Sequence, residues 1–366
     1  MISVLLVIIL LASVISGHLQ KTASFISACG MAWTAGIMPT NYSFDTAVYE
    51  KYYPFSPQTK IFEQGYMHIS YFMYNHGIDY TTFRIILYAI AYLILFVLVI
   101  KVTPKPALFF LLYGFVSFLS DATQVRNFCM LVLVMLAFII LNKVTPLRLI
   151  ISGISLILAV SFQTTGLIYV VAILVYVFKL GQKPGSKLVS IYFGSMLVLA
   201  VFFIVFGNTH ILSPILNRFI QMSGRSYVDQ AIMTYSTGGY SRYTLLYAAS
   251  YAIAFMVIHY LKKRVGQGNN WYYDAMYILF LVGVIGMPLT IVSSGFERIL
   301  RNSLVIFIIL ITRIPSYYWK KDAENFVIIG SLATFVLCMY GAGYFTNDPL
   351  YMGYYVKYML HFVATQ

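Results

Sequence analysis

The stretch Ser120-Asp121-Ala122-Thr123-Gln124-Val125-Arg126-Asn127 lies between two apolar runs, residues 108–119 and 128–141. Both runs are long enough to be buried in a membrane. Guanidinium, carboxylate and amide groups at the mouth of a membrane segment are costly unless they meet a partner or line a wet cavity. The stretch therefore indicates either an ordinary interhelical loop with an Asp121–Arg126 ion pair or part of a functional site.

The composition of the whole chain is that of a membrane protein. Its 366 residues are 60% hydrophobic and only 10% charged, whereas soluble domains are about 25% charged. Apolar runs of roughly 15–22 residues recur between short polar breaks. Lipid-exposed backbone must satisfy its own hydrogen bonds, so helices are the default spanning element. We expect an all-α, polytopic integral membrane protein.

The apolar runs predict about twelve transmembrane helices in a single domain over residues 1–366. The predicted spans are residues 1–16, 22–38, 80–101, 107–120, 126–142, 147–162, 165–180, 188–207, 243–261, 273–292, 298–314 and 325–343. The pairs 107–120/126–142 and 147–162/165–180 have short members, so either pair could form a bent or re-entrant element instead.

The distribution of basic residues predicts the orientation. Short lysine-rich loops mark the cytoplasmic side of a membrane protein. Here one set of alternate loops carries fourteen basic residues: Lys21, Lys101, Lys105, Lys143, Arg148, Lys179, Lys183, Lys187, Lys262, Lys263, Arg264, Arg313, Lys320 and Lys321. We therefore expect a multi-pass protein of the plasma or inner membrane with both termini outside. The two long loops, about residues 39–79 and 208–242, would also lie outside.

The outer side favours arginine over lysine. It carries only three lysines against seven arginines, which are Arg84, Arg126, Arg218, Arg225, Arg242, Arg298 and Arg301. A guanidinium binds phosphate or carboxylate through two hydrogen bonds, whereas lysine acts as a point charge. Two interpretations remain: these arginines pair with nearby carboxylates and snorkel, or they form an anion site at the outer membrane interface.

The segment 293–302 is the second strongest sign of such a site. Arg298, Arg301 and Asn302 share one helical face at positions i, i+3 and i+4. Two arginines so close together favour a doubly charged anion. Arg242 lies at the end of the long loop 208–242. The mixture of Gly, Ser, Tyr and Arg in that loop suits a mobile lid or an acceptor groove.

The first outer loop predicts two short helices with acidic and aromatic faces. Asp45, Tyr49 and Tyr53 fall on one face of the first, and Glu63 and Tyr66 on the second. Aromatic rings beside carboxylates suit a sugar, because rings cover its C–H face and carboxylates accept its hydroxyl hydrogens. An interfacial helix pair with a tyrosine belt is an equal alternative.

Several signatures are absent from the sequence. There is no P-loop, nucleophile elbow, His-x-x-x-His zinc pair or Asp-x-Asp motif. We therefore expect no metal and no cofactor. The net charge of +13 would suggest nucleic acid in a soluble protein, but here part of it follows from the positive-inside bias. No nucleic-acid partner is expected.

Four short motifs, taken in order, resemble the EpsG-like group of Wzy-type polysaccharide polymerases. They are Asp45…Tyr49…Tyr52/Tyr53, Glu63-x-Gly65-Tyr66, Val125-Arg126-Asn127 and Phe162-Gln163-Thr164-Thr165. In that group the third motif usually reads Ile-Arg-Gln or similar, and Arg126 matches its arginine. The fourth usually has a histidine followed by a Ser-Ala pair. The uncharged Gln163 replaces that histidine here.

The resemblance implies a membrane polymerase of polyprenyl-diphosphate-linked repeat units, as in O-antigen, capsule or exopolysaccharide synthesis. On the outer membrane face, a hydroxyl of one lipid-linked unit would attack the anomeric carbon of another and expel polyprenyl diphosphate. The implied partners are the lipid-linked donor and acceptor and membrane lipid. Flippase and chain-length regulator proteins are further possible partners.

The resemblance also suggests residue roles. Arg126, Arg298 and Arg301 would stabilise the diphosphate leaving group without a metal, and Asp45 or Glu63 would be the base. Asp121 and Glu297 would each orient a neighbouring arginine. Substrate contacts would come from Tyr49, Tyr53, Tyr66, Asp121, Gln124, Asn127, Gln163, Arg242 and Glu297.

Two other functions compete. A flippase or transporter of the same lipid-linked sugar would need polar residues distributed through the helices. Here the helix centres are nearly uncharged and polar character concentrates on one face, which favours interfacial chemistry. A ligase or acyltransferase on the outer face is the third possibility, and the acyltransferase would need a well-placed histidine base.

Overall fold

The structure is a computed structural model that describes residues 2–40, 43–141, 143–178, 187–206, 242–265, 271–292, 296–313 and 321–342. Throughout these residues the secondary structure is helical and contains no strand, so the predicted all-α class is confirmed. The chain forms two compact units, one holding Met1–Leu167 and the other Ile168–Gly343. The single domain expected from the sequence stays a prediction.

The first unit contains nine α-helices among its described residues. They are α1 (Ile2–Ser16), α2 (Gln20–Ile37), α3 (Phe44–Lys51), α4 (Gln64–Asn75), α5 (Tyr80–Val102), α6 (Pro106–Val116), α7 (Phe118–Thr123), α8 (Val125–Ile140) and α9 (Pro146–Phe162). Two single 3₁₀ turns, η2 (Pro57–Thr59) and η3 (Thr164–Gly166), join them. The short helices α3 and α4 lie where the sequence predicted two amphipathic pieces.

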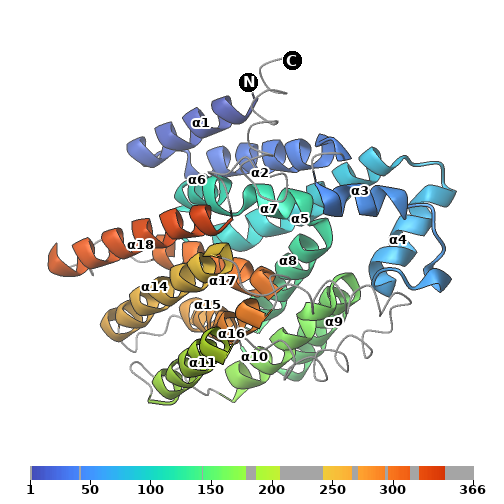
Figure 1. Ribbon diagram of the computed structural model, residues 1–366. Helices are drawn as coiled ribbons and strands as arrows, with labels where there is room; N and C mark the ends of the chain where they lie inside the picture. The colour runs from blue at the N-terminus through green and yellow to red at the C-terminus, as the bar shows by residue number, and fades with distance from the viewer. Residues whose placement is uncertain are drawn as a thin grey trace. The chain divides into compact units, whose positions relative to one another are not determined.

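The long helices of this unit lie side by side in the order α1, α2, α5, α8 and α9 (Figure 1). The contact between α2 and α5 depends on Gly36. A Cβ there would come within 2.8 Å of the Ile85 Cα, so only glycine allows this approach. The resulting backbone proximity sets the path of α5, which packs on α8, and α8 in turn packs on α9.

Arg84 of α5 ties the end of α2 to this arrangement. Its side chain is buried, and its Nη1 and Nη2 donate to the carbonyls of Met38 at 2.7 Å and Ala35 at 2.6 Å. The last carbonyls of a helix lack intrahelical partners and carry the negative end of its dipole. One of the seven arginines predicted to lie on the outer side therefore has a structural role as a C-terminal cap.

The opening stretch differs from the loop expected at 121–125. Residues 118–123 form α7, and α8 begins at Val125, so only Gln124 separates the two helices. The predicted span 107–120 is broken at Ser117 between α6 and α7. This polar stretch can form a helix inside the bundle because buried tyrosines of neighbouring helices donate hydrogen bonds to it.

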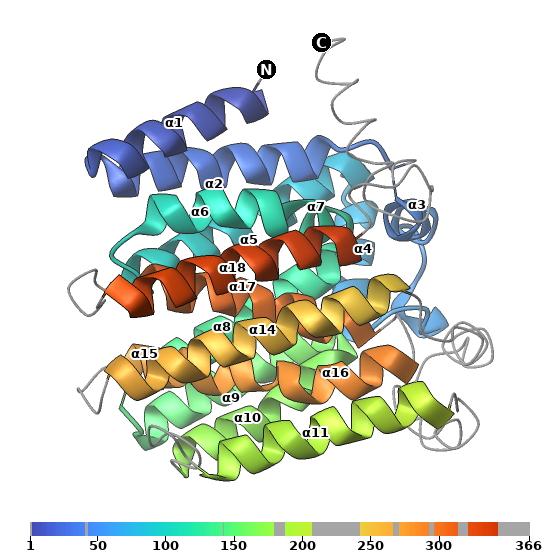
Figure 2. The same ribbon diagram turned by 60° about the vertical axis from the view of Figure 1, so that its left-hand side comes forward.

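The second unit has seven helices among its described residues. They are α10 (Leu167–Val177), α11 (Lys187–Phe206), α14 (Arg242–Val265), α15 (Trp271–Leu281), α16 (Gly283–Val292), α17 (Glu297–Arg313) and α18 (Lys321–Gly341). Helix α14 runs along α18, α11 packs on α16, and α15 and α16 both pack on α17 (Figure 2). The predicted span 273–292 is interrupted at Val282, between α15 and α16.

Four helical stretches of the described chain are long and apolar enough to cross a membrane. They are Tyr80–Val102, Lys187–Val205, Leu245–Lys262 and Trp271–Ile291. Six further apolar helices are 10–17 residues long. These helices are those of a membrane protein, while the count of twelve spans and the orientation stay predictions. The predicted loop 208–242 lies, except for Arg242, outside the described residues.

Candidate functional site

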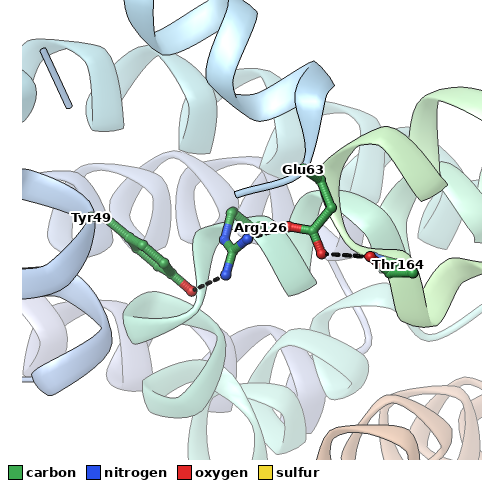
Figure 3. Close-up of polar contacts among 4 residues, drawn as sticks. All are labelled: Tyr49, Glu63, Arg126 and Thr164. Atoms are coloured by element: carbon green, nitrogen blue, oxygen red, sulfur yellow. Dashed lines mark hydrogen bonds and ion pairs between the residues drawn. The ribbon is translucent and has the colours of Figure 1, made fainter. Parts of the chain in front are cut away.

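Four residues from distant parts of the first unit meet around one guanidinium (Figure 3). Arg126 lies in the first turn of α8, Glu63 immediately precedes α4, Tyr49 belongs to α3, and Thr164 begins η3. The short helices α3 and α4 thus bring acidic and aromatic side chains onto the start of the apolar helix α8. All four sequence motifs contribute a side chain to this site.

A buried ion pair is the centre of the site. Nη1 of Arg126 donates to Oε2 of Glu63, and the two residues are only 5% and 7% exposed. The other carboxylate oxygen, Oε1, accepts hydrogen bonds from the backbone N–H and the hydroxyl of Thr164, both at 2.9 Å. Both oxygens of Glu63 are therefore engaged, which holds the carboxylate in one orientation.

Aromatic rings surround the guanidinium. Its Cζ lies 4.8 Å from the ring centroid of Tyr49, 4.4 Å from that of Phe62 and 5.8 Å from that of Tyr66. Nη2 of Arg126 also donates to the Tyr49 hydroxyl at 3.5 Å. Cations are attracted to ring faces at these distances, and the attraction strengthens when water is excluded. The rings compensate part of the cost of burying the charge.

The site retains unused hydrogen-bonding capacity. Within the described part of the chain, the buried Nε of Arg126 and the buried Oε1 of Gln163 have no hydrogen-bond partner. Buried polar atoms that lack a hydrogen-bond partner are rare, and each calls for an explanation such as a ligand or an ordered water. A guanidinium with a free N–H edge can bind a phosphate oxygen.

Gly65 allows α4 to approach α9 closely enough to form the site. A Cβ on Gly65 would lie 2.1 Å from the Ser161 Oγ and 2.9 Å from the Ser161 carbonyl oxygen. This contact holds the start of α4, and hence Glu63, against the chain that carries Thr164. The glycine of the second sequence motif is therefore explained by a close backbone approach.

The Asp121–Arg126 ion pair suggested by the sequence is not the one that forms. The partner of Arg126 is Glu63, whereas Asp121 is fully buried in α7 and its Oδ2 accepts a hydrogen bond from the Tyr113 hydroxyl at 2.9 Å. The Tyr88 hydroxyl donates to the backbone carbonyls of Asp121 and Ala122. Tyrosine hydroxyls of α5 and α6 thus donate hydrogen bonds to acceptors of α7 inside the helix bundle.

Tyr53 and Tyr66 belong to the packed aromatic cluster of residues 44–83. The Tyr53 hydroxyl donates to the Ile78 carbonyl at 2.9 Å, and its ring stacks on Phe83 at 5.1 Å between centroids. Burial, followed by the Asp79 carboxylate, raises the pKa of Tyr53 to about 12, so this hydroxyl stays a donor at neutral pH. Burial also raises the pKa of Tyr66 well above its usual range.

The other predicted residues of the first unit lie close in sequence to these contacts. Asp45 is half-buried, one turn before Tyr49 on α3. Gln124 is the half-buried N-cap residue of α8, and Asn127 is buried in its first turn. Residues four apart on a helix lie on the same face, so Asp45 shares the face of α3 that presents Tyr49 to Arg126.

The remaining predicted residues belong to the second unit, which is described by itself. Arg301 of α17 is buried, and its Nη1 lies 3.8 Å from Oε1 of Glu297 one turn earlier. Arg298 is half-buried, and Arg242 is the first residue of α14. The structure thus brings Glu297 and Arg301 together, and separately Glu63 and Arg126.

Phe62 was missed in the sequence analysis. It contributes the ring nearest to the Arg126 guanidinium, and its only sequence signal is its position next to Glu63. The Glu63–Arg126 pairing was also missed, because 63 residues separate the partners. Among the described residues, no group of three His, Cys, Asp or Glu side chains lies close enough to hold a metal ion.

Comparison with known proteins gives one finding. A family model described as the EpsG family matches residues 21–360. No curated protein and no solved structure matches the chain. The matched range includes every residue of the Arg126 site.

Proposed function

Because this chain belongs to the EpsG family, which suggests a role of the polysaccharide polymerase type, we propose that it joins polyprenyl-diphosphate-linked oligosaccharide repeat units on the extracytoplasmic membrane face. The product would be a surface polysaccharide such as a capsule, exopolysaccharide or O-antigen. The observation that carries the proposal is the buried, aromatic-lined guanidinium of Arg126, which Glu63 orients and whose Nε remains available.

The proposed reaction is a glycosyl transfer. A hydroxyl oxygen of the acceptor unit forms a bond to the anomeric carbon of the donor, and the bond between that carbon and the diphosphate oxygen breaks. The electron pair of that bond leaves with polyprenyl diphosphate, and the hydroxyl proton passes to a base. Negative charge develops on the leaving group, so a cation fixed in advance near it lowers the barrier.

Arg126 is the group best suited to receive that charge. It is held on one side by Glu63 and on its faces by rings, so little reorganisation accompanies the reaction. Arg298 and Arg301 remain additional proposed ligands of the diphosphate, on the basis of their spacing in the sequence. Each can be tested by substitution independently of Arg126.

The geometry favours Asp45 over Glu63 as the base. Both oxygens of Glu63 already accept hydrogen bonds, and an adjacent cation stabilises the charged form of a carboxylate. Such a group is a weak proton acceptor, so Glu63 is proposed as the residue that positions Arg126. Asp45 is half-buried on the face of α3 that also carries Tyr49.

The proposal is tested by gel analysis of surface polysaccharide in a deletion strain that carries the wild type, Arg126→Lys or Arg126→Ala. Lysine keeps the charge but lacks the planar guanidinium fork that can donate two parallel hydrogen bonds to a phosphate. We expect both variants to lose the long-chain ladder. Arg126→Lys keeps a cation beside Glu63 and should reach the membrane at the normal level, whereas Arg126→Ala leaves the buried Glu63 charge unpaired and should be less stable. Loss of one such electrostatic contact typically costs about 10²–10³ in rate. Lys51→Gln, which removes an exposed cation of the same outer loop, should keep the ladder.

The same experiment separates the competing functions. For a polymerase, single repeat units still reach the outer face when the ladder is lost. If Arg126→Ala traps the single units inside the cell, the protein exports them instead. A full ladder in the Arg126→Lys strain would overturn the role given to this residue.

A further inference from the structure

A groove at the other end of the first unit has the features of a lipid site. It has a volume of about 610 Å³ and lies between the second half of α5, the end of α8 and the start of α9. Its walls are apolar and include Leu93, Val97, Leu98, Leu136, Ile140 and Ile151. Lys101 and Arg148 are the two charged residues that line it, and both are cations.

The cations lie at the same end of the groove-forming helices. Lys101 is in the last turn of α5, and Arg148 is in the first turn of α9. Nη1 of Arg148 is buried and has no hydrogen-bond partner within the described chain. The backbone N–H of Arg148 is already used, because it donates to the N-cap Thr145 at 3.4 Å. Nη1 of the guanidinium is therefore a buried donor of Arg148 that lacks a partner within the described chain.

The groove is separate from the Arg126 site. Arg126 is in the first turn of α8, while the groove is lined by Leu136, Ile139 and Ile140 in its last turns. At about 1.5 Å per residue, thirteen residues of helix place the two sites roughly 20 Å apart along α8. Lys101 and Arg148 also belong to the loops whose lysine content predicts the cytoplasmic side.

We propose that this groove binds one glycerophospholipid with an anionic headgroup, such as phosphatidylglycerol, from the cytoplasmic leaflet. An acyl chain would lie along the apolar walls, and the phosphate would be bound by Arg148 and Lys101. Basic pockets between transmembrane helices on the cytoplasmic side are a recognised arrangement for anionic headgroups, and guanidinium matches phosphate geometry. This inference does not depend on the proposed polymerase activity.

The test is native mass spectrometry of the purified full-length chain with phosphatidylglycerol and phosphatidylcholine of identical acyl chains. Two cations near a lipid surface predict a preference of the wild type for phosphatidylglycerol of about tenfold or more. Lys101→Gln/Arg148→Gln should reduce this preference to within about twofold. The matched control Lys105→Gln/Lys143→Gln removes two exposed cations from neighbouring loops without touching the groove, and should keep it.

A steric variant keeps the test independent of charge. Val97→Trp places a large side chain in the groove at a position that is already partly exposed, and it should lower phosphatidylglycerol retention with both cations present. If Lys101→Gln/Arg148→Gln does not fold, Lys101→Arg/Arg148→Lys should retain the preference, and its loss would overturn the proposal.

Three further results contradict the inference. They are equal retention of both lipids by the wild type, an equal loss in the matched control, and displacement of phosphatidylglycerol by equimolar polyprenyl phosphate. The first would mean an unspecific acyl-chain groove, the second general surface charge, and the third a site for the carrier lipid.

Discussion

At the scale of single residues, arginine has two different uses on the side predicted to be outer. Arg84 is bound by two backbone carbonyls at the end of α2, which is a structural role. Arg126 contacts the Glu63 carboxylate and three aromatic rings, and its Nε has no hydrogen-bond partner within the described chain. Both were equal members of one pattern in the sequence, and only their surroundings distinguish them.

Glu63→Gln tests the positioning role of the carboxylate. Removing one partner of a buried ion pair leaves an uncompensated charge and typically costs about 3–5 kcal/mol. We expect a large fall in the thermal unfolding temperature of the purified protein and loss of the polysaccharide ladder. Thr164→Val keeps the backbone hydrogen bond to Glu63 and removes only the hydroxyl, so it should cost about 1 kcal/mol and keep the ladder.

The double variant Glu63→Gln/Arg126→Met separates stability from function. With both charges gone, the desolvation penalty disappears, so stability should recover relative to Glu63→Gln alone. The ladder should not recover, because the cation is absent. Unchanged stability in Glu63→Gln would show that the ion pair does not hold the site together.

At the scale of helices, the site depends on the close contact between α4 and α9. Gly65→Ala introduces a Cβ that would lie 2.1 Å from the Ser161 Oγ and 2.9 Å from its carbonyl oxygen. Because backbone cannot yield like a side chain, α4 must move and carry Glu63 away from Thr164. We expect about 1–3 kcal/mol of destabilisation together with reduced polymer length on gels.

The matched control lies in the same helix pair. A Cβ at Gly153 of α9 meets nothing within 4 Å, so Gly153→Ala should be neutral or stabilising by up to about 1 kcal/mol. Ser161→Gly should rescue Gly65→Ala only in part, since the carbonyl contact remains. If Gly65→Ala behaves like Gly153→Ala, the close approach does not determine the position of Glu63.

At the scale of the whole molecule, the orientation in the membrane is the prediction that locates the reaction. In a variant whose three cysteines are replaced by alanine, Gln58→Cys and Lys105→Cys each place one exposed thiol on opposite predicted sides. A membrane-impermeant maleimide should label Gln58→Cys in intact cells and Lys105→Cys only after permeabilisation. The reverse pattern would place the Arg126 site in the cytoplasm and contradict extracytoplasmic polymerisation.

The sequence by itself determined the helical class and most helix positions. Long apolar runs leave the backbone no other way to satisfy its hydrogen bonds in lipid, so α5 was predicted as residues 80–101 and found as Tyr80–Val102. Local spacing also located the two short helices α3 and α4 with their acidic and aromatic residues. The motifs identified the family because each is a short local segment that can be read directly from the sequence.

Only the tertiary structure decided which polar groups meet. Asp121 lies five residues from Arg126 and was one suggested partner, yet Glu63, 63 residues away, forms the ion pair. Likewise the α6–α7 break at Ser117 and the cap made by Arg84 follow from contacts between helices. Charges near a membrane pair wherever packing brings them together, and packing is a property of side-chain shape over the whole fold.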